Sequence, residues 1–513
     1  MINLAKTIMV QGTSSNVGKS ILTAALCRIF LQDGYRVAPF KAQNMALNSF
    51  VTPAGGEMGR AQVVQAEACR IDPDVIMNPV LLKPTQQASS QIVVLGKPIG
   101  NLSATHYHNS YKDKAWEVIT QSLEKLMADF QVLVIEGAGS PAEVNLKAND
   151  VVNMRVAREV NSPVLLVADI DRGGALASIV GTLELLEPEE RALIKGLIIN
   201  KFRGDLNLLK PALDFLEEKT GKPVVGVIPY FSDIKIPEED SVVIETINTS
   251  YQDKAKLDIA VINLPHIANF TDFDALADEI DVKLRFVKKG ISLGNPDLII
   301  IPGSKNTIAD MLYLESSNLS RQIKDLALLH NTPVIGICGG YQILGRKMND
   351  PYQIESDLGE CRGLGLLPIE TEFLTEKVTS QVKGQVIVNN GLLTGCQGLN
   401  IEGYEIHMGR TEIIEKIKTP FVLIERGGNK IQVADGAISS NGLILGTYLH
   451  GIFDNDLLRR QILNNIRISK GWKPIQSPTV NTKFEREKAF NNLAELVRKN
   501  INLPYLYEIM GLR

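Results

Sequence analysis

The stretch VIGICGGYQILG, residues 334–345, constrains the fold of this chain more than any other. An apolar run ends in Cys338, two glycines follow directly, and a helical pattern then begins. A strand, a sharp turn and a helix in this order form a nucleophile elbow, which lifts one side chain out of a sheet. The backbone N–H of Gly339 can then hold an oxyanion. The sequence therefore predicts an α/β fold with Cys338 as a nucleophile. The alternative is a buried core cysteine at the end of a strand.

A cysteine nucleophile needs a base, and the stretch GTYLHGIFD, residues 446–454, offers one in His450 at the end of a β-like run. In open α/β sheets, functional sites lie at the carboxyl ends of the strands, where His450 is expected. The apolar strand LIIIPGSKNT, residues 298–307, breaks into a glycine turn whose Gly303 N–H is a second candidate oxyanion donor. Each stretch, taken alone, is equally typical of an ordinary strand end.

A second site is predicted near the start of the chain, where GTSSNVGKS, residues 12–20, joins an apolar strand to an amphipathic helix. Such a loop cradles phosphate oxygens with its backbone N–H groups, while Lys19 neutralises the β- and γ-phosphates and Ser20 binds Mg²⁺. A chance glycine-rich turn is the alternative. The candidate ATP-binding residues in this loop are Gly12, Thr13, Asn16, Gly18, Lys19 and Ser20.

Two further apolar runs end in acidic residues. The stretch QVLVIEGAGS, residues 131–140, ends in Glu136, and PVLLVADIDRGG, residues 163–174, ends in Asp169. A carboxylate at such a strand end can hold Mg²⁺ or a water bound to it, although strand-end acids also cap the helix that follows. Near-continuous apolar runs are expected where helices cover both faces of a parallel sheet.

The strand signals divide the chain. They stop in the polar, acidic and proline-marked stretch of residues 232–256 and resume at Leu257. A length of 513 residues suits two large domains or about three smaller ones. The predicted parts are a P-loop parallel-sheet domain over 1–235, a linker over 236–256, a second α/β domain over 257–470 and a helical tail over 471–513.

Composition excludes several classes of protein. A formal charge of −4 and a pI near 6.0 give no basic field for nucleic acid. Five cysteines without tight spacing indicate a reduced cytoplasm rather than a disulfide framework. Because no apolar run approaches about 18 residues, no membrane span is expected. The chain enters its first strand after six residues, so no signal peptide is expected.

Taken together, Cys338, His450 and the glycine turns resemble the triad-type (class I-like) glutamine amidotransferase domain. In that family a cysteine attacks the side-chain amide of glutamine and releases ammonia. The family pattern usually places a glutamate two residues after the histidine, where this chain has Ile452. The cobyrinate-type branch of the family shares this absence. The resemblance leaves the third member of the site unassigned.

The phosphate loop has one residue more between its glycines than the common pattern. In this it resembles dethiobiotin synthetase and its relatives, which use ATP to activate a carboxylate as an acyl phosphate. The stretch LIINKFRGD, residues 197–205, resembles the loop with which these enzymes face the nucleotide base. The resemblance thus implies that Asn200 and Lys201 contact ATP.

Residues 39–69, 77–84 and 403–411, with the order of the two domains, resemble the cobyric acid synthase family over essentially the whole chain. The resemblance implies a glutamine-hydrolysing carbon–nitrogen ligase that uses ATP and Mg²⁺. Its expected reaction is amidation of the b, d, e and g carboxylates of adenosylcobyrinic a,c-diamide, a corrinoid, in cobalamin biosynthesis. Amide and amine donors after the strand at 35–40 suit a carboxylate-rich substrate, although each could be an ordinary polar loop residue. They are Lys41, Gln43, Asn44 and Asn48.

Two alternatives stay open. A partition-type ATPase switch also begins with a variant phosphate loop, but those proteins carry an extra lysine near its start that GTSSNVGKS lacks. The closer alternative is cobyrinic acid a,c-diamide synthase or another glutamine-dependent ligase, against which residues 41–44 and 77–84 argue.

Overall fold

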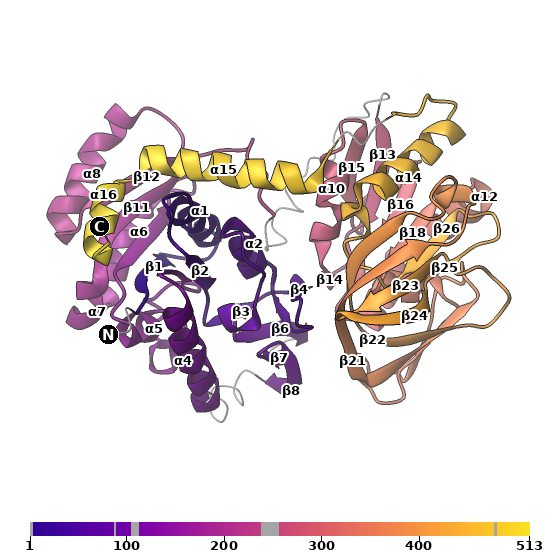
Figure 1. The fold of residues 1–513 in the computed structure, drawn as a ribbon, viewed down its shortest axis with the longest axis horizontal. Coiled ribbons are helices and arrows are strands. Elements are labelled where there is room, and N and C mark those ends of the chain that lie inside the picture. Colours follow the sequence, from indigo (N-terminus) through magenta and orange to yellow (C-terminus); the bar gives the residue numbers. More distant parts are fainter. Residues whose placement is uncertain (1–3, 87–88, 104–111, 238–255, 477–479, 513) are drawn as a thin grey trace. The chain divides into compact units, whose positions relative to one another are not determined.

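A computed structural model describes residues 4–86, 89–103, 112–237, 256–476 and 480–512 (Figure 1). The chain forms two compact units, each described below by itself. The first unit consists of Met1–Ala46, Glu57–Pro237 and Phe484–Arg513, and the second of Leu47–Gly56 and Glu238–Lys483. Most of the expected linker, residues 238–255, lies outside the described residues.

The first unit is built on a six-stranded sheet in the order β12-β11-β10-β1-β9-β2, in which all neighbouring strands are parallel. Five of its strands are fully or largely buried and half of the residues of the edge strand β12 are, as the apolar runs predict for a sheet covered on both faces. The α/β parallel architecture expected from the sequence is confirmed. The strands are β1 Lys6–Gly12, β2 Val37–Phe40, β9 Val132–Glu136, β10 Val164–Asp169, β11 Ile194–Phe202 and β12 Val224–Pro229.

Helices of the first unit pack on this sheet. Helix α1 contacts β1, β2 and β9, because its apolar residues share a core with theirs. The helices are α1 Lys19–Gln32, α2 Arg60–Ala68, α4 Lys112–Asp129, α5 Met154–Glu159, α6 Ala175–Leu185, α7 Pro188–Leu193 and α8 Leu206–Thr220. A smaller sheet, β3-β6-β7-β8, consists of Gln43–Met45, Val80–Gln86, Ser89–Val94 and Lys97–Ser103.

The end of the chain returns to the first unit. Phe490 and Leu493 of α15 (Thr482–Asn500) and Leu506 of α16 (Leu503–Met510) belong to the same apolar core as Phe30 of α1. Both helices are drawn in yellow in Figure 1. Buried Arg28 of α1 also pairs with Glu487 at 2.9 Å. Amphipathic patterning predicts a helix here, but only the folded chain assigns that helix to the N-terminal sheet.

The second unit has a six-stranded sheet in the order β15-β13-β16-β18-β26-β25, parallel except for the last pair. A short pair, β14 (Ile267–Ala268) with β17 (Gly303–Ser304), lies beyond the main strands. The strands of the main sheet are β13 Leu257–Ile262, β15 Val282–Val287, β16 Leu298–Ile301, β18 Val334–Ile337, β25 Ala437–Ile438 and β26 Ile444–Thr447. The helices are α10 Asp274–Ala277, α11 Thr307–Ser316, α12 Leu319–Leu329, α13 Gly339–Leu344 and α14 Asp456–Ser469.

A largely antiparallel sheet shares the core of the second unit, as Phe373 and Phe421 pack in one cluster with Ile335 of the parallel sheet. Alternating apolar residues after Gly359 predict this β-rich region. Its strands are β19 Lys347–Asn349, β20 Glu360–Arg362, β21 Ile369–Val386, β22 Asn400–Ile413, β23 Phe421–Arg426 and β24 Asn429–Asp435. Across the residues that the structure describes, we find no helix with the length and apolar character needed to cross a membrane.

Candidate active sites

Cys338 lies at a sharp turn between β18 and α13, as the sequence predicts. Its backbone has φ 52° and ψ −109°, a conformation that costs free energy for a residue with a side chain. The turn also needs glycine at 340, because a Cβ there would lie 1.9 Å from the carbonyl oxygen of Ile301. Strain of this kind persists only where the surrounding packing imposes it. The packing around the turn therefore holds Cys338 in this conformation at the end of β18.

His450 follows β26 and is held by a carboxylate that the sequence did not indicate. Its Nδ1 lies 2.7 Å from Oδ2 of Asp272, and the other carboxylate oxygen accepts a hydrogen bond from the N–H of Gly451 at 2.9 Å. Both side chains are buried, with exposed fractions of 1% and 3%. Asp272 comes from a short 3-10 turn, η4 (Phe270–Phe273). Ile452, which occupies the usual glutamate position, packs in the apolar core.

Electrostatics favour the protonated form of His450. Burial by itself lowers the pKa of this imidazole, but the charge and hydrogen bond of Asp272, together with the adjacent Cys338, raise the pKa to about 10. An imidazolium beside a cysteine stabilises the thiolate, which is the nucleophilic form. The arrangement can therefore keep a proton on His450 for a leaving group.

The two glycines expected to donate to an oxyanion also lie at this site. A Cβ on Gly303 would stand 2.9 Å from Cε1 of His450, and one on Gly339 would stand 2.9 Å from the backbone N of Ser304. The structure therefore brings together all four residues predicted for the second unit, although the oxyanion role itself stays a prediction.

A polar network beside the elbow was not found from the sequence. The hydroxyl of Thr307 donates to Gln342 Oε1 at 3.1 Å, and Gln342 Nε2 donates to the Tyr448 hydroxyl at 3.2 Å. The ring of His407 stacks on Tyr448 with 3.8 Å between centroids. Gln342 lies four residues after Cys338, so its place on the first turn of α13 was the signal available in the sequence.

In the first unit, the loop after β1 has the backbone of a phosphate-binding loop. Gly18 begins α1 with φ 99°, and the helix start carries no capping side chain. Asn16 also has a positive φ of 62°. A Cβ on Gly18 would lie 2.2 Å from the side-chain nitrogen of Asn200, which itself donates to the carbonyl of Val17 at 2.8 Å. An uncapped helix N-terminus with such a loop is suited to bind phosphate.

Lys19 and Ser20 face the residues that the strand ends supply. The Lys19 ammonium donates to the carbonyls of Ser14 and Gly139 at 2.8 and 3.2 Å. The Ser20 hydroxyl donates to Oε1 of Glu136 at 2.8 Å. The structure thus joins three of the predicted ATP-site residues at the end of the central strands.

Glu136 is the centre of a buried polar cluster. Lys41 Nζ lies 2.8 Å from its Oε1, and Gln65 Nε2 donates to its Oε2 at 2.5 Å. Burial alone raises the pKa of Glu136, but Lys41, Gln65 and Ser20 together lower the pKa below its ordinary value. An ionised carboxylate beside a serine hydroxyl is a set of hard oxygen donors, which fits Mg²⁺.

Asp169 has a different partner. Its Oδ2 lies 2.8 Å from the ammonium of Lys201, which also donates to the carbonyl of Asn16 at 2.7 Å. Lys201, with φ 59°, and Asn200 therefore brace the phosphate loop from β11. Within the described ranges, we find no group of three or more His, Cys, Asp and Glu side chains arranged to hold a metal ion. A metal role for Asp169 stays a prediction.

The residues proposed to bind the carboxylate-rich substrate divide between the units. Lys41 contacts Glu136, and Asn44 donates to Gln62 Oε1 at 3.0 Å, both in the first unit. Gln43 lies beside them in β3 and is partly buried. Asn48 belongs to the second unit, where its side-chain oxygen accepts a hydrogen bond from the N–H of Phe270 at 3.1 Å. The substrate-binding role of all four residues stays a prediction.

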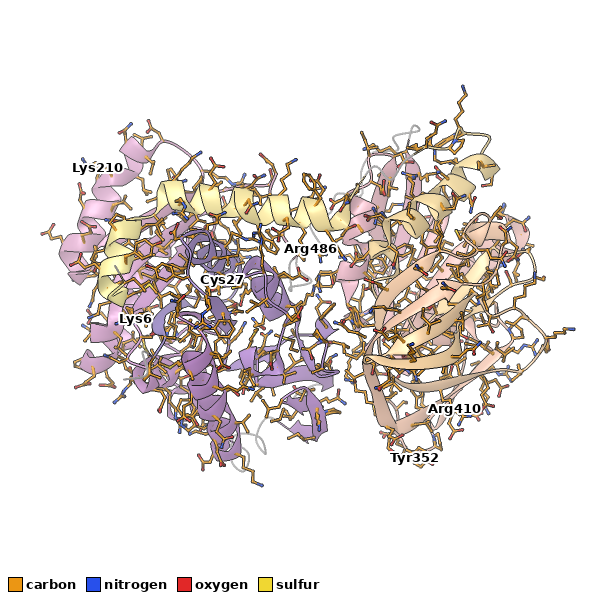
Figure 2. All side chains as sticks on the ribbon, viewed as in Figure 1. Lys6, Cys27, Lys210, Tyr352, Arg410 and Arg486 are labelled. Atoms are coloured by element: carbon orange, nitrogen blue, oxygen red, sulfur yellow. The ribbon has the colours of Figure 1, made fainter. Side chains whose placement is uncertain are left out.

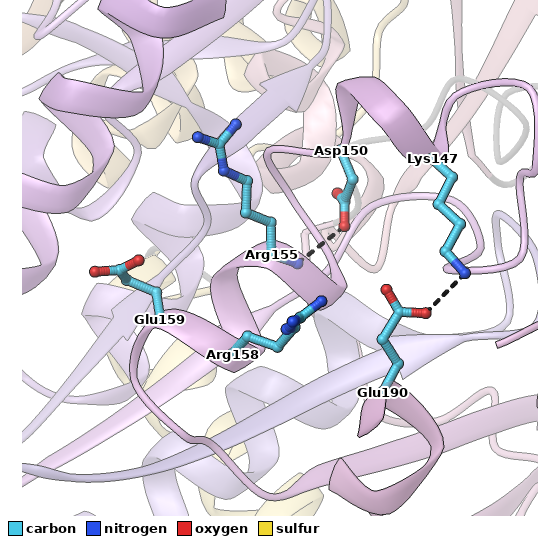
Figure 3. Close-up of a pocket in the computed structure, with 6 residues that line it drawn as sticks. All are labelled: Lys147, Asp150, Arg155, Arg158, Glu159 and Glu190. Carbon is cyan, nitrogen blue, oxygen red and sulfur yellow. Dashed lines mark hydrogen bonds and ion pairs between the residues drawn. The ribbon is translucent and has the colours of Figure 1, made fainter. Parts of the chain in front are cut away.

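The first unit also has a polar pocket of about 540 Å³ that the sequence did not indicate, and Figure 3 shows six residues that line it. Two of its three carboxylates, Asp150 and Glu190, have partners within the fold. Asp150 accepts backbone hydrogen bonds from residues 152, 153 and 155, and Glu190 pairs with Lys147 at 2.9 Å. The pocket also includes Arg155, Arg158 and Glu159, and we assign it no role in the chemistry.

The two domains match known families. Residues 258–458 match the model of the CobB/CobQ-like glutamine amidotransferase domain, and residues 8–243 match the model of the CobQ/CobB/MinD/ParA nucleotide binding domain. Fold and sites together define a glutamine-dependent amidoligase, with a P-loop domain followed by an amidotransferase domain.

Within that class, the chain belongs to the cobyric acid synthase family. It is 55% identical to the cobyric acid synthase of Moorella thermoacetica over 99% of this chain and 98% of that protein. It is 56% identical to the cobyric acid synthase of Desulfitobacterium hafniense and 53% identical to that of Pelotomaculum thermopropionicum, again over 99% of this chain. These matches cover 98% and 97% of the two relatives.

Proposed function

We propose that this protein amidates the b, d, e and g carboxylates of adenosylcobyrinic a,c-diamide to give adenosylcobyric acid in cobalamin biosynthesis, with ATP and glutamine as co-substrates. One observation carries the proposal: the same chain contains two sites. The first is the P-loop cluster around Glu136, and the second is the arrangement of Cys338, His450 and Asp272. Full-length similarity to cobyric acid synthases supports the choice of a corrinoid substrate. Five free cysteines suit a reducing compartment, and the cytoplasm is the proposed location.

In the first unit, a carboxylate of the corrinoid attacks the γ-phosphate of ATP, and ADP leaves. Loop N–H groups and Lys19 stabilise the charge on the transferring phosphoryl group. Ser20 and Glu136 would hold Mg²⁺, which supplies charge neutralisation for the phosphates when bound. Lys41, Gln43 and Asn44 are the proposed contacts to the substrate in this unit. The product is an acyl phosphate, in which the carboxyl carbon is activated for attack by nitrogen.

In the second unit, Cys338 Sγ attacks the side-chain amide carbon of glutamine. The N–H groups of Gly303 and Gly339 would stabilise the resulting oxyanion. His450 gives its proton to the departing nitrogen, so that ammonia leaves and a thioester remains, and water then releases glutamate. Asp272 keeps the imidazole in the required orientation and stabilises its charged form. Ammonia attacks the acyl phosphate, and phosphate leaves as the amide forms.

The test is a reconstituted assay with purified protein, ATP, Mg²⁺, glutamine carrying a nitrogen label in its side-chain amide, and candidate corrinoids. Mass spectrometry should show adenosylcobyrinic a,c-diamide converted with four labelled amides. Amidation of cobyrinic acid at the a and c carboxylates instead would favour the related a,c-diamide synthase. ATP hydrolysis without any amide product would favour a nucleotide switch.

A further inference from the structure

A short piece of the N-terminal half belongs to the second unit. The chain leaves the first unit after Ala46 and returns at Glu57, and the segment between them contains β4 (Ser49–Val51). Asn48, Ser49 and Val51 are buried there. The N–H of Ser49 donates to the side-chain oxygen of Asn269 at 3.0 Å, and Gln381 donates to the carbonyl of Val51 at 2.9 Å. We refer to residues 48–51 as the inserted strand.

Tyr404 of β22 lies directly against His450. The two residues exchange backbone hydrogen bonds of 2.9 and 3.2 Å as an isolated antiparallel bridge. Their rings are stacked, with 5.1 Å between centroids and 16° between planes. Rotation of a histidine ring about its last torsion is broad and two-fold in character, so a flat neighbour restricts it. Tyr404 therefore limits the plane that the imidazole can adopt.

The inserted strand supports Tyr404 from another direction. The ring of Phe50 lies 4.9 Å from the Tyr404 ring at 59°, and the Tyr404 hydroxyl donates to the carbonyl of Ser49 at 3.5 Å. Val51 shares a small apolar cluster with Tyr404 and Ile406. The carbonyl of Ile406 accepts the 3.5 Å contact from Cys338 Sγ, so the same stretch of β22 borders both catalytic side chains.

The inserted strand also reaches the turn that carries Asp272. Its Asn48 and Ser49 bond to Phe270 and Asn269 at the start of η4. Asn269 has φ 56°, a conformation that asparagine tolerates better than most residues, and its carbonyl accepts from the N–H of Asp272. One strand thus contacts both supports of His450, namely the stacked ring and the carboxylate turn.

We propose that Phe50 and Tyr404 are positioning residues for glutamine hydrolysis, which fix the orientation of His450 through the inserted strand. This inference rests on the proposed glutaminase reaction at Cys338 and adds residues that do not touch glutamine. Reacting groups need placement to a fraction of an ångström, and a misplacement of about 1 Å can cost about 100-fold in rate. The N-terminal half of the chain therefore contributes to a reaction carried out in the second unit.

Within the part of the chain that the structure describes, three titratable groups contact His450, so the pH dependence of glutamine hydrolysis reports on the surroundings of this ring. Asp272 faces it from η4, Cys338 from the elbow and Tyr404 from β22. The aromatic face of Tyr404 also favours the cationic ring. Loosening the stack and the turn weakens these interactions, so the pKa of His450 falls from about 10 toward its ordinary value. The alkaline limb of the rate profile should then move to lower pH.

The experiment measures glutamate release by full-length Phe50→Ala and Tyr404→Leu proteins. We expect kcat to fall by about 10- to 100-fold, with KM changed by less than about 2-fold and the alkaline limb shifted to lower pH. Amidation driven by ammonium salt should match the wild type, because the P-loop cluster is untouched. Phe50→Tyr, which keeps the ring, should restore the rate. Tyr352→Ala is the matched control, since it removes a ring that is 59% exposed in the same unit (Figure 2).

The outcomes separate the two proposals. Wild-type kcat and pH profile in Phe50→Ala, with Cys338→Ala inactive toward glutamine, would overturn the positioning role and leave the proposed function intact. Glutamine hydrolysis that persists in Cys338→Ala would overturn the proposed site itself. A rise in KM at constant kcat would show that Phe50 acts in binding glutamine. If Tyr404→Leu does not fold, two variants still test the inference. Tyr404→Phe keeps the stacked ring, and Phe50→Ala changes a side chain that is only partly buried.

Discussion

Replacing Asp272 by asparagine tests the least expected member of the amidotransferase site. The substitution keeps the size of the side chain and removes its charge. The carboxylate lies 2.7 Å from His450 Nδ1, and both side chains are almost fully buried. An asparagine can also present its NH₂ group to the ring, which favours the wrong tautomer of the imidazole.

The magnitude follows from the distance and the pKa of His450. Two unit charges 2.7 Å apart interact by about 6 kcal/mol at an effective dielectric constant of about 20. A pKa raised from 6.5 to about 10 corresponds to about 5 kcal/mol in favour of the imidazolium, after the opposing effect of burial. Since part of this energy is already present before the reaction, we expect Asp272→Asn to lower the kcat for glutamine hydrolysis about 10³-fold.

The assay compares glutamate release from glutamine with amidation supported by ammonium salt in the same preparation. Ammonia-driven amidation should stay at the wild-type rate, because Asp272 lies in the second unit and the P-loop cluster in the first. Asp325→Asn is the matched control, since it makes the same change at a position in α12 that is about half exposed. A folded Asp272→Asn enzyme that keeps more than about a tenth of the wild-type kcat would refute the role assigned to this carboxylate.

Four further predictions test other parts of the molecule. Cys338→Ala should abolish glutamine-dependent amidation and leave ammonia-dependent amidation, and equal loss of both in a folded protein would contradict separate sites. Lys19→Ala should lower amidation with either nitrogen donor by about 10²–10³-fold, since acyl phosphate formation precedes attack by nitrogen; near wild-type turnover with ammonia would exclude this loop. Ile452→Glu should lower stability and leave glutaminase activity flat or reduced, because Ile452 is 2% exposed and a carboxylate there loses hydration; a several-fold gain in glutaminase rate would contradict this. Burial of Asp435 raises its pKa to about 6. Its contribution to the free energy of unfolding is therefore fully present below about pH 3.8 and is lost as the pH rises through about 6, a change of about 3 kcal/mol. Urea titrations across this pH range should show the change in the wild type and not in Asp435→Asn.

The sequence by itself determined the local architecture of both sites. An apolar strand, a glycine turn and a helix start are set by backbone conformation and by short-range periodicity, and both can be read along a few residues. The elbow at Cys338 and the loop that ends in Lys19 and Ser20 therefore have the predicted form. Glu136 was also found from sequence, because a buried parallel strand delivers its last side chain to the rim of the sheet.

Only the tertiary structure decided which distant residues complete these sites. Asp272 and His450 are 178 positions apart, and no pattern marks the 3-10 turn that carries the carboxylate. The order of strands brings that turn to the rim beside β26, a result of long-range packing rather than of local propensity. The placement of Asn48 in the second unit has the same origin, and so does the return of residues 484–513 to the first. The local sequence limits the conformations that a residue's backbone can adopt. The partner of its side chain depends on how the whole chain packs around its apolar cores.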